Sequence, residues 1–491
     1  MKHQAIRISA LMIAAAFAQS AFASGYHFGT QSISAQGTAN SNAAEAGDAT
    51  VLFYNPAGMS YLQGDQFSGV LAIVNPNVSF TDKGSYTAGG VPTKGGNGGD
   101  IVKPTAVPHL YYTHKMDDAL SVGVAAFVPY GDAISYDENW AGRYNIIETK
   151  LESFNINPSF ALKVNDRLRI GGGISAQYMT GTLVKGSDFG SGVASLVAPM
   201  LPGMQADVLA GRIPAAAFQA LVGEVKTMQG NPKYDGSVTV KGDDWGFGWN
   251  VGLMFDIDES NRFSLAYRSQ IRQKLTGDAK WTLPSSLAAM PLVGTTVSNL
   301  LKTKGYVAGG ASISIVTPES LSMSFLHRVD KDLALTASLT RTDHSRLQNL
   351  TIKLDSGLPQ SNTVENWRNT WAGAIGATYR QSEQLTLRAG MSQDQSPVQD
   401  QFRTPSLPDG DRKTFAFGGN YALNKGNNID FVASYTTMGT LPIKQFDNGG
   451  ITDANGTPVC NQALNLSSCA TMVGEYKITA WTFGIQYNYK F

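Results

Sequence analysis

The six histidines are the side chains best suited to acid–base chemistry, and they are scattered along the chain. They are His3, His27, His109, His114, His327 and His344. None of them stands in a recognisable triad motif, and the sequence contains no Gly-x-Ser-x-Gly nucleophile elbow. A lipase or protease needs a nucleophile beside a base. We therefore expect a protein that is not an enzyme and that uses no metal ion or cofactor.

The two cysteines, Cys460 and Cys469, lie close together in one polar stretch. A disulfide is the default state of such a pair in an exported protein. A metal or redox site is the alternative, but no Cys-x-x-Cys motif and no nearby histidine pair accompanies them. We predict a disulfide that closes a short loop.

The first 23 residues have the parts of a secretory signal peptide. A basic start with Lys2 and Arg7 precedes an apolar run at 8–18, and the small-residue pattern Ala21-Phe22-Ala23 follows. An anchoring helix is the alternative, but the run is shorter than the roughly 20 residues that span a bilayer. We place cleavage after Ala23, so that the mature chain begins at Ser24.

The composition of the mature chain is unusual for a soluble protein. Only 15% of the residues are charged, whereas about a quarter is usual in soluble domains. The net charge is zero, which argues against nucleic-acid binding. No segment is long and apolar enough for a transmembrane helix, yet the chain holds 52 glycines and 19 tyrosines. An exported chain of this composition is typical of a membrane β-barrel.

The C-terminal segment shows the clearest strand pattern. Large apolar residues alternate with small or polar ones, the apolar set being Trp481, Phe483, Ile485, Tyr487, Tyr489 and Phe491. This period of two is expected of a strand with lipid on one side and a polar lumen on the other. The pattern recurs in 168–178, 245–255 and 333–340. A soluble sandwich could also alternate, but the uninterrupted apolar face and the signal peptide favour a barrel.

Short polar turns give the number of strands. They lie at 115–118, 164–167, 256–262, 329–332, 381–384 and 424–428. In bacterial barrels the short turns face the periplasm and the long loops face outward. Six turns join twelve strands, and a strand near 67–80 and the final strand bring the total to fourteen. We predict an all-β protein whose residues 66–491 form a 14-stranded antiparallel transmembrane barrel, monomeric, in the cell outer membrane.

Two of the long outer loops are unusually apolar. We expect outer loops near 81–105, 130–150, 184–240, 277–315, 343–367, 393–413 and 437–475. The third and fourth are the apolar ones, and Pro214 followed by 215–225 predicts a helix. Such loops favour a hydrophobic landing groove, whose expected lining is Leu201, Phe218, Leu221, Leu287, Met290 and Leu292. The alternative is that the two loops only pack on each other as a cap.

The segment before the first strand, residues 24–65, is small and polar. It has too little apolar surface to fold alone. Its most notable motif is the turn signal Asn55-Pro56-Ala57-Gly58. A fourteen-stranded lumen is an open channel unless something fills it. We therefore predict an N-terminal hatch at 24–65 that plugs the barrel. A disordered tail is the alternative.

Taken in order, these motifs resemble the FadL family of outer-membrane long-chain fatty acid transporters, over essentially the whole mature chain. The resemblance rests on Ser24-Gly25-Tyr26, on Asn55 to Gly58, and on the segments 245–250, 261–269, 394–398 and 407–412. It implies passive uptake of a long-chain fatty acid or a similar hydrophobic molecule by a barrel surrounded by outer-membrane lipid and lipopolysaccharide. The ligand is expected to land between the third and fourth outer loops and to enter a pocket that includes Tyr26. It then leaves sideways into the membrane beside an inward-kinked third strand.

The third strand is expected at 119–127, and it is followed by Val128-Pro129-Tyr130-Gly131. Pro129 cannot donate a ladder hydrogen bond, and Gly131 weakens the strand further. The residues therefore predict a kink, and a lateral opening at Pro129 and Gly131, where the family has one. The alternative is that Pro129 begins an outer loop.

A fatty acid carboxylate inside the barrel would need a basic partner, because an unpaired charge in an apolar pocket is very costly. The candidates are Arg268, on the polar face of its strand, and Arg368, where the family tends to carry a basic residue. Asp394 is expected to pair with one of them. A basic residue expected near the end of the fifth strand is replaced by Gly181 or Thr182. The alternative function, uptake of aromatic or other uncharged hydrocarbons, needs no such residue.

Overall fold

The computed structural model describes residues 25–454, 457–461, 466–467 and 469–491. The expected signal peptide, residues 1–23, and Ser24 lie outside the described residues. The strands are β1 (Gln66–Asp82), β2 (Thr105–Lys115), β3 (Leu120–Phe127), β4 (Gly131–Ser135), β5 (Glu148–Lys163), β6 (Leu168–Asp188), β7 (Asp235–Asp256), β8 (Asn261–Arg268), β9 (Ile271–Thr282), β10 (Gly309–Thr317), β11 (Ser320–Arg328), β12 (Leu333–Thr342), β13 (Asn349–Leu354), β14 (Ser361–Val364), β15 (Thr370–Arg380), β16 (Leu385–Asp394), β17 (Arg412–Ala422), β18 (Asn427–Phe446) and β19 (Thr471–Lys490).

The helices are few and short. The α-helices are α2 (Ile33–Gln36), α3 (Val51–Tyr54), α4 (Phe189–Val197), α5 (Leu201–Leu209), α6 (Ala215–Thr227), α7 (Ser285–Ala288) and α8 (Gly294–Thr303). The 3-10 helices are η1 (Pro56–Tyr61), η2 (Ala198–Met200), η3 (Pro232–Tyr234), η4 (His344–Arg346) and η5 (Asp400–Phe402). Among the described residues, no helix has the length and apolar character needed to cross a membrane.

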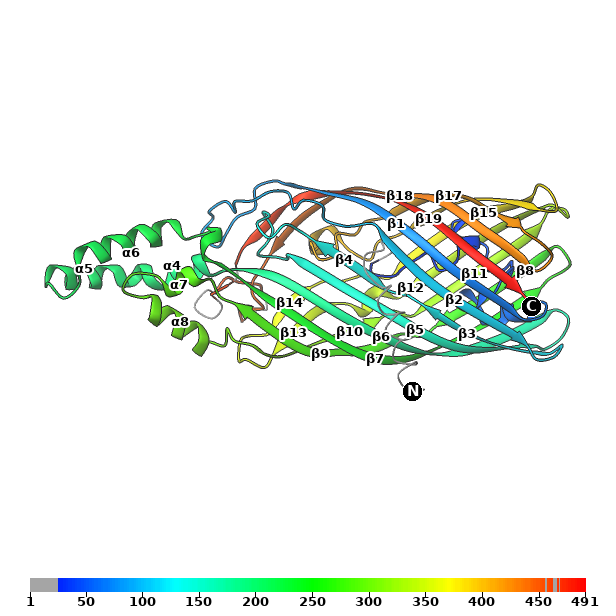
Figure 1. Cartoon of the computed structure of the whole chain (residues 1–491), viewed down its shortest axis with the longest axis horizontal. Helices are drawn as coiled ribbons and strands as arrows, with labels where there is room; N and C mark the ends of the chain where they lie inside the picture. Colours follow the sequence, from blue (N-terminus) through cyan, green and yellow to red (C-terminus); the bar gives the residue numbers. More distant parts are fainter. Residues whose placement is uncertain (1–24, 455–456, 462–465, 468) are drawn as a thin grey trace.

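The strands form one closed antiparallel barrel of fourteen, which confirms the number inferred from the turns (Figure 1). The first and last strands close the ring, because β1 pairs with β19 from Gln66 opposite Lys490 to Asp82 opposite Gly474. Nineteen labels describe fourteen strands because five barrel strands are each divided into two segments. These are β3 with β4, β8 with β9, β10 with β11, β12 with β13, and β14 with β15.

The alternation of apolar and polar residues in the sequence correctly predicts which side chains face outward. In β7, Phe247 is 75% exposed on the outer surface, whereas the inward residue Asn250, three positions further along, is buried. In β19, Ile485 is exposed and Gln486 is fully buried. Each of the six predicted short turns joins two neighbouring strands at the end where the C-terminus lies (Figure 1).

The strands extend further outward than the sequence pattern predicted. Segments at 131–135, 349–354 and 361–364 were expected in outer loops, but they form β4, β13 and β14. The ladder between β6 and β7 continues to Asp188 opposite Asp235, well inside the expected third loop. Pairing satisfies the backbone groups of these polar segments even where no lipid requires it, so hydropathy alone underestimates their length.

The third and fourth outer loops carry helices α4 to α8, which project beyond one end of the barrel (Figure 1). The predicted helix at 215–225 is observed as α6, and Pro214 is its N-cap. Proline suits this place because its missing N–H would be unpaired at the start of a helix anyway.

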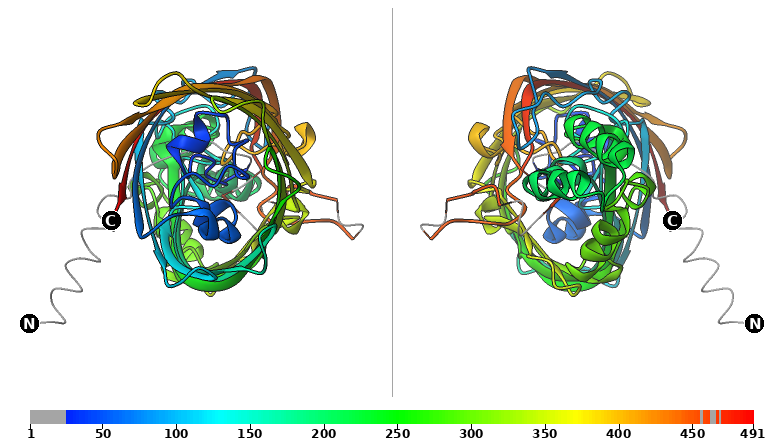
Figure 2. Two further views of the ribbon diagram at one scale, coloured as in Figure 1. Left: turned by 90° about the vertical axis from the view of Figure 1, so that its right-hand side faces the viewer. Right: turned by 90° about the vertical axis from the view of Figure 1, so that its left-hand side faces the viewer.

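The N-terminal segment, residues 25–65, lies inside the ring of strands (Figure 2). It is bound to the wall through polar groups. The backbone N–H of Ile33 donates to Gln486 Oε1 at 2.9 Å, and Gln36 Nε2 donates to Ser434 Oγ at 2.9 Å. Its few apolar side chains, including Leu52, are buried against the inner face of the barrel. A segment poor in apolar residues is thus held by hydrogen bonds to an inward-facing polar wall.

Candidate functional site

The third barrel strand is interrupted at Val128-Pro129-Tyr130, between β3 and β4. On one side, the ladder from β2 ends at Leu110 opposite Ala126, before the interruption. On the other side, β5 pairs with β3 up to Phe127 and with β4 from Gly131. Because the strand resumes after Pro129, this residue marks a break within the strand and does not begin an outer loop. We call residues 128–130 the strand break.

Side chains of neighbouring elements satisfy the backbone of the strand break. The N–H of Val128 donates to His109 Nδ1 at 3.2 Å, and the carbonyl of Val128 accepts from Gln31 Nε2 at 2.7 Å. Ser153 Oγ accepts from the N–H of Tyr130 at 2.9 Å and donates to its carbonyl at 2.7 Å. Since Nδ1 of His109 accepts, its Nε2 carries the proton and donates to the carbonyl of Thr30. Buried backbone groups that lack a ladder partner need such substitutes.

The N-terminal segment completes the strand break with its own backbone. The N–H of Phe28 donates to the carbonyl of Pro129 at 2.8 Å, and the N–H of Gly131 donates to the carbonyl of Tyr26 at 2.9 Å. His27 and Tyr130 form an isolated antiparallel bridge between these two bonds. The start of the N-terminal segment and the strand break are therefore one hydrogen-bonded unit.

An apolar cavity of about 120 Å³ lies beside this unit. The ring of Tyr26 forms part of its wall, packed 5.5 Å from the ring of Tyr130 and 5.4 Å from that of Trp367. The hydroxyl of Tyr26 donates to the carbonyl of Val316 at 3.1 Å. Aliphatic side chains from six strands and two outer loops supply the rest of the wall, among them Leu151, Leu183, Leu275, Ile313, Leu347 and Leu407. We call this space the apolar cavity.

The charged side chains that face the apolar cavity are acids. Asp132 of β4 and Glu365, which follows β14, both line it, and each is only 5% exposed. Burial raises the pKa of Glu365 to about 7, against the opposing effect of the hydrogen bond that its carboxylate accepts from Trp367 Nε1 at 3.1 Å. The cavity wall also includes Lys150 and Lys241, but these occupy outward positions of β5 and β7, next to the inward residues Leu151 and Gly242.

Arg268 lies in a second space, a chamber of about 230 Å³ with a mixed polar and apolar lining, between the N-terminal segment and the wall. Its guanidinium lies 4.8 Å from the ring centroid of Phe53, and its Nη2 donates to the Phe53 carbonyl at 2.8 Å. Asp394 lines the same chamber, and its Oδ2 lies 3.8 Å from Arg412 Nη1. The structure thus brings two of the predicted polar residues, Arg268 and Asp394, into one chamber.

Arg368 is placed outside both spaces. Its side chain is 52% exposed; Nη2 lies 3.5 Å from Asp411 Oδ1, and Nε donates to the carbonyl of Ser396 at 3.1 Å. Gly181, where the family resemblance led us to expect a base, lines the apolar cavity and contributes no charge.

The Asn55-Pro56-Ala57-Gly58 motif anchors the N-terminal segment to the wall. Asn55 Nδ2 donates to the carbonyls of Leu253 and Leu265, at 2.9 and 3.1 Å, and to Ser264 Oγ at 2.8 Å. Its Oδ1 accepts from the N–H of Ala57 and so caps η1, where Pro56 occupies the first turn. A buried side chain thus ties this turn to two barrel strands, β7 and β8.

The predicted landing-groove residues are mostly buried in a core between the third and fourth outer loops. Leu221, Leu287 and Met290 belong to this core, and the partly buried Leu201 packs against it. Phe218 is buried on the same helix as Leu221. Leu292 stands apart, at 43% exposure. In this conformation the two loops pack on each other, so a ligand that lands there would have to part them.

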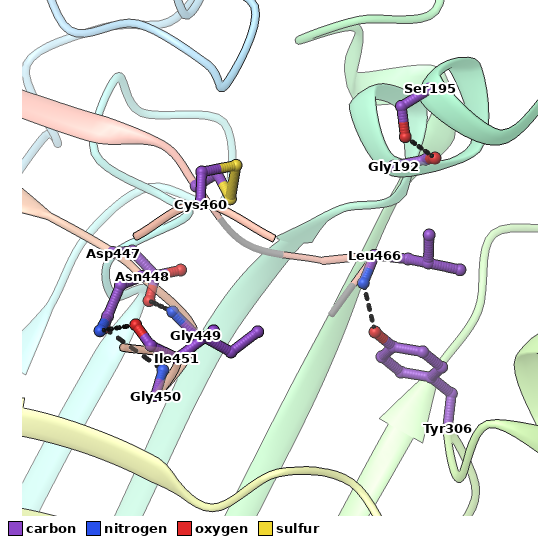
Figure 3. The surroundings of a disulfide bond; sticks show 11 residues. Gly192, Ser195, Tyr306, Asp447, Asn448, Gly449, Gly450, Ile451, Cys460 and Leu466 are labelled. Atoms are coloured by element: carbon purple, nitrogen blue, oxygen red, sulfur yellow. Dashed lines mark hydrogen bonds between the residues drawn. A yellow bond between two sulfur atoms is a disulfide. The ribbon is translucent and has the colours of Figure 1, made fainter. Parts of the chain in front are cut away.

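The structure contains the predicted disulfide between Cys460 and Cys469 (Figure 3). Next to it, the last outer loop is fastened to the fourth, because the N–H of Leu466 donates to the hydroxyl of Tyr306 at 2.8 Å. Gly192 of α4 permits this approach, since a Cβ there would lie 1.9 Å from the carbonyl oxygen of Leu466. The disulfide thus stabilises a loop that supports the outer-loop core.

Sequence reasoning missed Asp132 and Glu365 as cavity residues, and His109, Gln31 and Ser153 as partners of the strand break. Asp132 gave no usable signal, because the alternation of β3, in which Ala125 and Phe127 face inward, would place position 132 outward, whereas the register shifts by one residue across the strand break. The others come from distant parts of the chain, and no local pattern joins them.

Comparison with known proteins gives consistent matches over the whole chain. The family profile described as outer membrane protein transport protein (OMPP1/FadL/TodX) matches residues 14–491. A protein of Neisseria meningitidis serogroup B, whose name places it only in the outer membrane, is 35% identical over 100% of both chains. A long-chain fatty acid transport protein of Escherichia coli O6:H1 is 28% identical over 98% of both chains.

Two solved structures share the fold. The crystal structure of a FadL homologue from Pseudomonas aeruginosa has a TM-score of 0.78 at 22% identity, covering 95% of this chain and 100% of the other. The toluene transporter of Ralstonia pickettii has a TM-score of 0.59 at 16% identity, covering 95% and 99%.

Proposed function

Because this chain belongs to the OMPP1/FadL/TodX family of outer-membrane transport proteins, which are channels for hydrophobic substrates and not enzymes, we propose that it takes up long-chain fatty acids by passive diffusion. The proposed ligand lands on the outer loops, enters the apolar cavity, and leaves sideways into the membrane at the strand break. The identity of the ligand is supported by the relative from Escherichia coli O6:H1, which is named for fatty acid transport.

The observation that carries this route is the double role of Tyr26. Its ring forms part of the wall of the apolar cavity, while its carbonyl accepts from Gly131 at the strand break. A ligand that displaces the ring therefore acts directly on the hydrogen bonds that keep the strand break closed. The lateral route passes Pro129 and Gly131. In this part of the wall the ladder with β2 is already missing.

The N-terminal segment is the proposed hatch of this channel. It fills the lumen, and its anchors include the Asn55 motif, the contacts with β18 and β19, hydrogen bonds of Ser41 and Ala44 to β12 and β11, and the pairing with the strand break. Only the last of these lies next to the apolar cavity. We therefore infer that transport loosens the start of the segment, at Tyr26 to Phe28, while the Asn55 motif stays in place.

Uptake of aromatic hydrocarbons is the second candidate function. The volume of the apolar cavity, about 120 Å³, is close to the roughly 150 Å³ of an engineered apolar cavity that binds benzene. The fold neighbour from Ralstonia pickettii is named as a toluene transporter.

Growth of a deletion strain on a single carbon source distinguishes the two candidates. The host should lose growth on oleate when the gene is deleted and regain it with the plasmid-borne gene. Growth on toluene should be unaffected. Loss of growth on toluene alone would favour the hydrocarbon channel, and unchanged growth on both substrates would contradict uptake of either.

Arg268→Ala should weaken uptake of oleate by about tenfold while leaving uptake of an uncharged hydrocarbon nearly unchanged, because a buried guanidinium can pair with a carboxylate. Arg368→Ala should have a smaller effect, since exposed ion pairs contribute little. Uptake of labelled ligands by intact cells measures both, and the hydrocarbon controls for misfolding. An equal loss of oleate uptake and hydrocarbon uptake in Arg268→Ala would contradict a carboxylate-binding role for Arg268.

A further inference from the structure

We propose that the apolar cavity selects ligands whose head group donates a hydrogen bond, namely an alcohol, an alkylammonium or a protonated carboxylic acid, and that it excludes a carboxylate anion. This inference rests on the proposed function, because it treats the cavity as a binding site on the uptake route. It assigns the choice of head group to Asp132 and Glu365, the two acids in a mostly aliphatic wall.

Asp132 has unused capacity to accept hydrogen bonds. It faces inward from β4, opposite Leu151, and lies one residue beyond Gly131. Its carboxylate accepts from the N–H of Ala133, and no ion pair with an arginine or lysine is found for it among the described residues. Its charged neighbour is another acid, Asp409, which is itself bound to Arg412. Burial raises the pKa of Asp132 to about 8, but a carboxyl group keeps acceptor lone pairs in either charge state, so Asp132 can accept from a ligand.

Glu365 supplies the second acceptor. One carboxylate oxygen, Oε2, accepts from Trp367 Nε1, and the Trp367 ring continues the cavity wall next to Tyr26. In the part of the chain that the structure describes, Glu365 has no ion pair with a base. Tyr26, the titratable neighbour, uses its hydroxyl hydrogen on the carbonyl of Val316. Neither Tyr26 nor Trp367 therefore offers a free donor that would hold a carboxylate.

The cations near the wall are already engaged or face away. Lys150 Nζ lies 2.9 Å from Glu152 Oε1, and Lys241 is exposed on the outer side of β7. A ligand carboxylate in this cavity would lose its hydration and meet two acids, which together raise its free energy strongly. A hydroxyl or ammonium group would instead donate a hydrogen bond to the buried carboxyl oxygens of Asp132 or Glu365, which otherwise accept few hydrogen bonds. A fatty acid would pass this site with its carboxyl group protonated.

Equilibrium binding to the mature protein in lipid nanodiscs tests the proposal. The probes are 1-dodecanol, dodecylamine and laurate at pH 8, which share one chain length and differ in the head group. Gly181→Phe provides the baseline, because Gly181 lines the cavity and a ring there fills it. After this baseline is subtracted, dodecanol and dodecylamine should bind about tenfold more tightly than laurate, the difference expected from one net hydrogen bond.

Neutralising the acids should change the order of the ligands. In the double variant Asp132→Asn, Glu365→Gln, dodecylamine should lose about tenfold in affinity and laurate should gain. Asp411→Asn is the matched control, because Asp411 is an acid in the same outer loop as Leu407 but does not itself line the cavity. Tighter binding of laurate than of dodecanol by the wild type, or an unchanged order in the double variant, would overturn the proposal while leaving the uptake function standing. Failure of all three probes to bind above the baseline would overturn both.

The pH dependence of dodecylamine binding gives a second readout. An alkylammonium resembles a lysine side chain, whose pKa is about 10.4, so the ligand stays charged between pH 6 and 8. Burial raises the pKa of Glu365 to about 7 and that of Asp132, which also lies near Asp409, to about 8, so both carboxyl groups lose protons over this interval. Affinity should therefore rise from pH 6 to pH 8, Glu365→Gln should reduce this rise, and the double variant Asp132→Asn, Glu365→Gln should flatten it. A rise of equal size in Glu365→Gln would contradict the role of Glu365.

Discussion

Gly171→Val is expected to turn the plugged barrel into a leaking one. Gly171 faces inward from β6, and a Cβ atom there would lie 2.5 Å from the amide nitrogen of Ala57 and 2.7 Å from the carbonyl carbon of Pro56. These are backbone atoms of the anchoring turn and cannot rotate aside. A valine must push the turn off the wall and break the three hydrogen bonds that Asn55 donates to β7 and β8.

The expected leak is large, because a fourteen-stranded lumen without its plug is an aqueous channel. Conductance in planar bilayers and the sensitivity of intact cells to vancomycin should each increase by about tenfold or more. Gly172→Val is the matched control. Gly172 faces the lipid one residue away, and the nearest atoms to its Cβ lie at 3.4 Å. This variant should behave like the wild type.

Asn55→Ala removes the same hydrogen bonds without a steric clash. It therefore distinguishes a leak caused by a displaced plug from a leak caused by a misfolded barrel. It should fold and leak, although less than Gly171→Val. If both variants fold and neither leaks, the Asn55 motif does not hold the plug in place, and the remaining contacts of the segment with the wall are sufficient.

The barrel could be predicted from the sequence because the bilayer imposes a simple rule on each strand. Side chains that touch lipid must be apolar, and their neighbours need not be, so a period of two is visible even in single segments such as Trp245 to Phe255. Short turns such as Lys115 to Asp118 then fix the number of strands. Both signals are local, and each barrel strand repeats them independently.

The cavity could not be predicted in the same way because its walls are assembled from distant segments. Asp132 and Glu365 are separated by more than half of the barrel sequence, and only closure of the ring brings both to Tyr26. The sequence offers arginines as obvious partners for a carboxylate, yet Arg368 lies on an exposed loop beside Asp411. Residue type indicates which chemistry is possible, whereas the fold decides which side chains face the same space.

The strand break could be predicted from the sequence only in part. Pro129 showed from the sequence that a ladder hydrogen bond must be missing. It did not show that His109, Gln31 and Ser153 replace the ladder, or that Tyr26 and Phe28 pair with the gap. Those partners make the break a set of bonds to side chains and to the backbone of the N-terminal segment, which are separate from the ladders of the neighbouring strands.

Gly131→Phe should reduce uptake of fatty acid by about tenfold or more while leaving ligand binding at the cell surface unchanged, since a filled opening blocks exit but not capture. The side chain has room at this position, because the nearest atom to a Cβ at Gly131 is the carbonyl oxygen of Leu151 at 3.7 Å. The variant should therefore fold. Uptake of labelled oleate by cells and its binding to energy-depleted cells are the two measurements.

The matched control is Gly373→Phe. Gly373 is also an outward-facing glycine of the barrel wall, opposite Leu339 in β12, and no atom lies within 4 Å of its Cβ position. Any general effect of an extra aromatic ring on membrane insertion should appear in both variants. A loss of uptake confined to Gly131→Phe would place the exit at the strand break, because the two variants differ only in the strand that carries the ring. Unchanged uptake in Gly131→Phe would contradict lateral exit there, and the ligand would then have to pass the N-terminal segment to reach the periplasm.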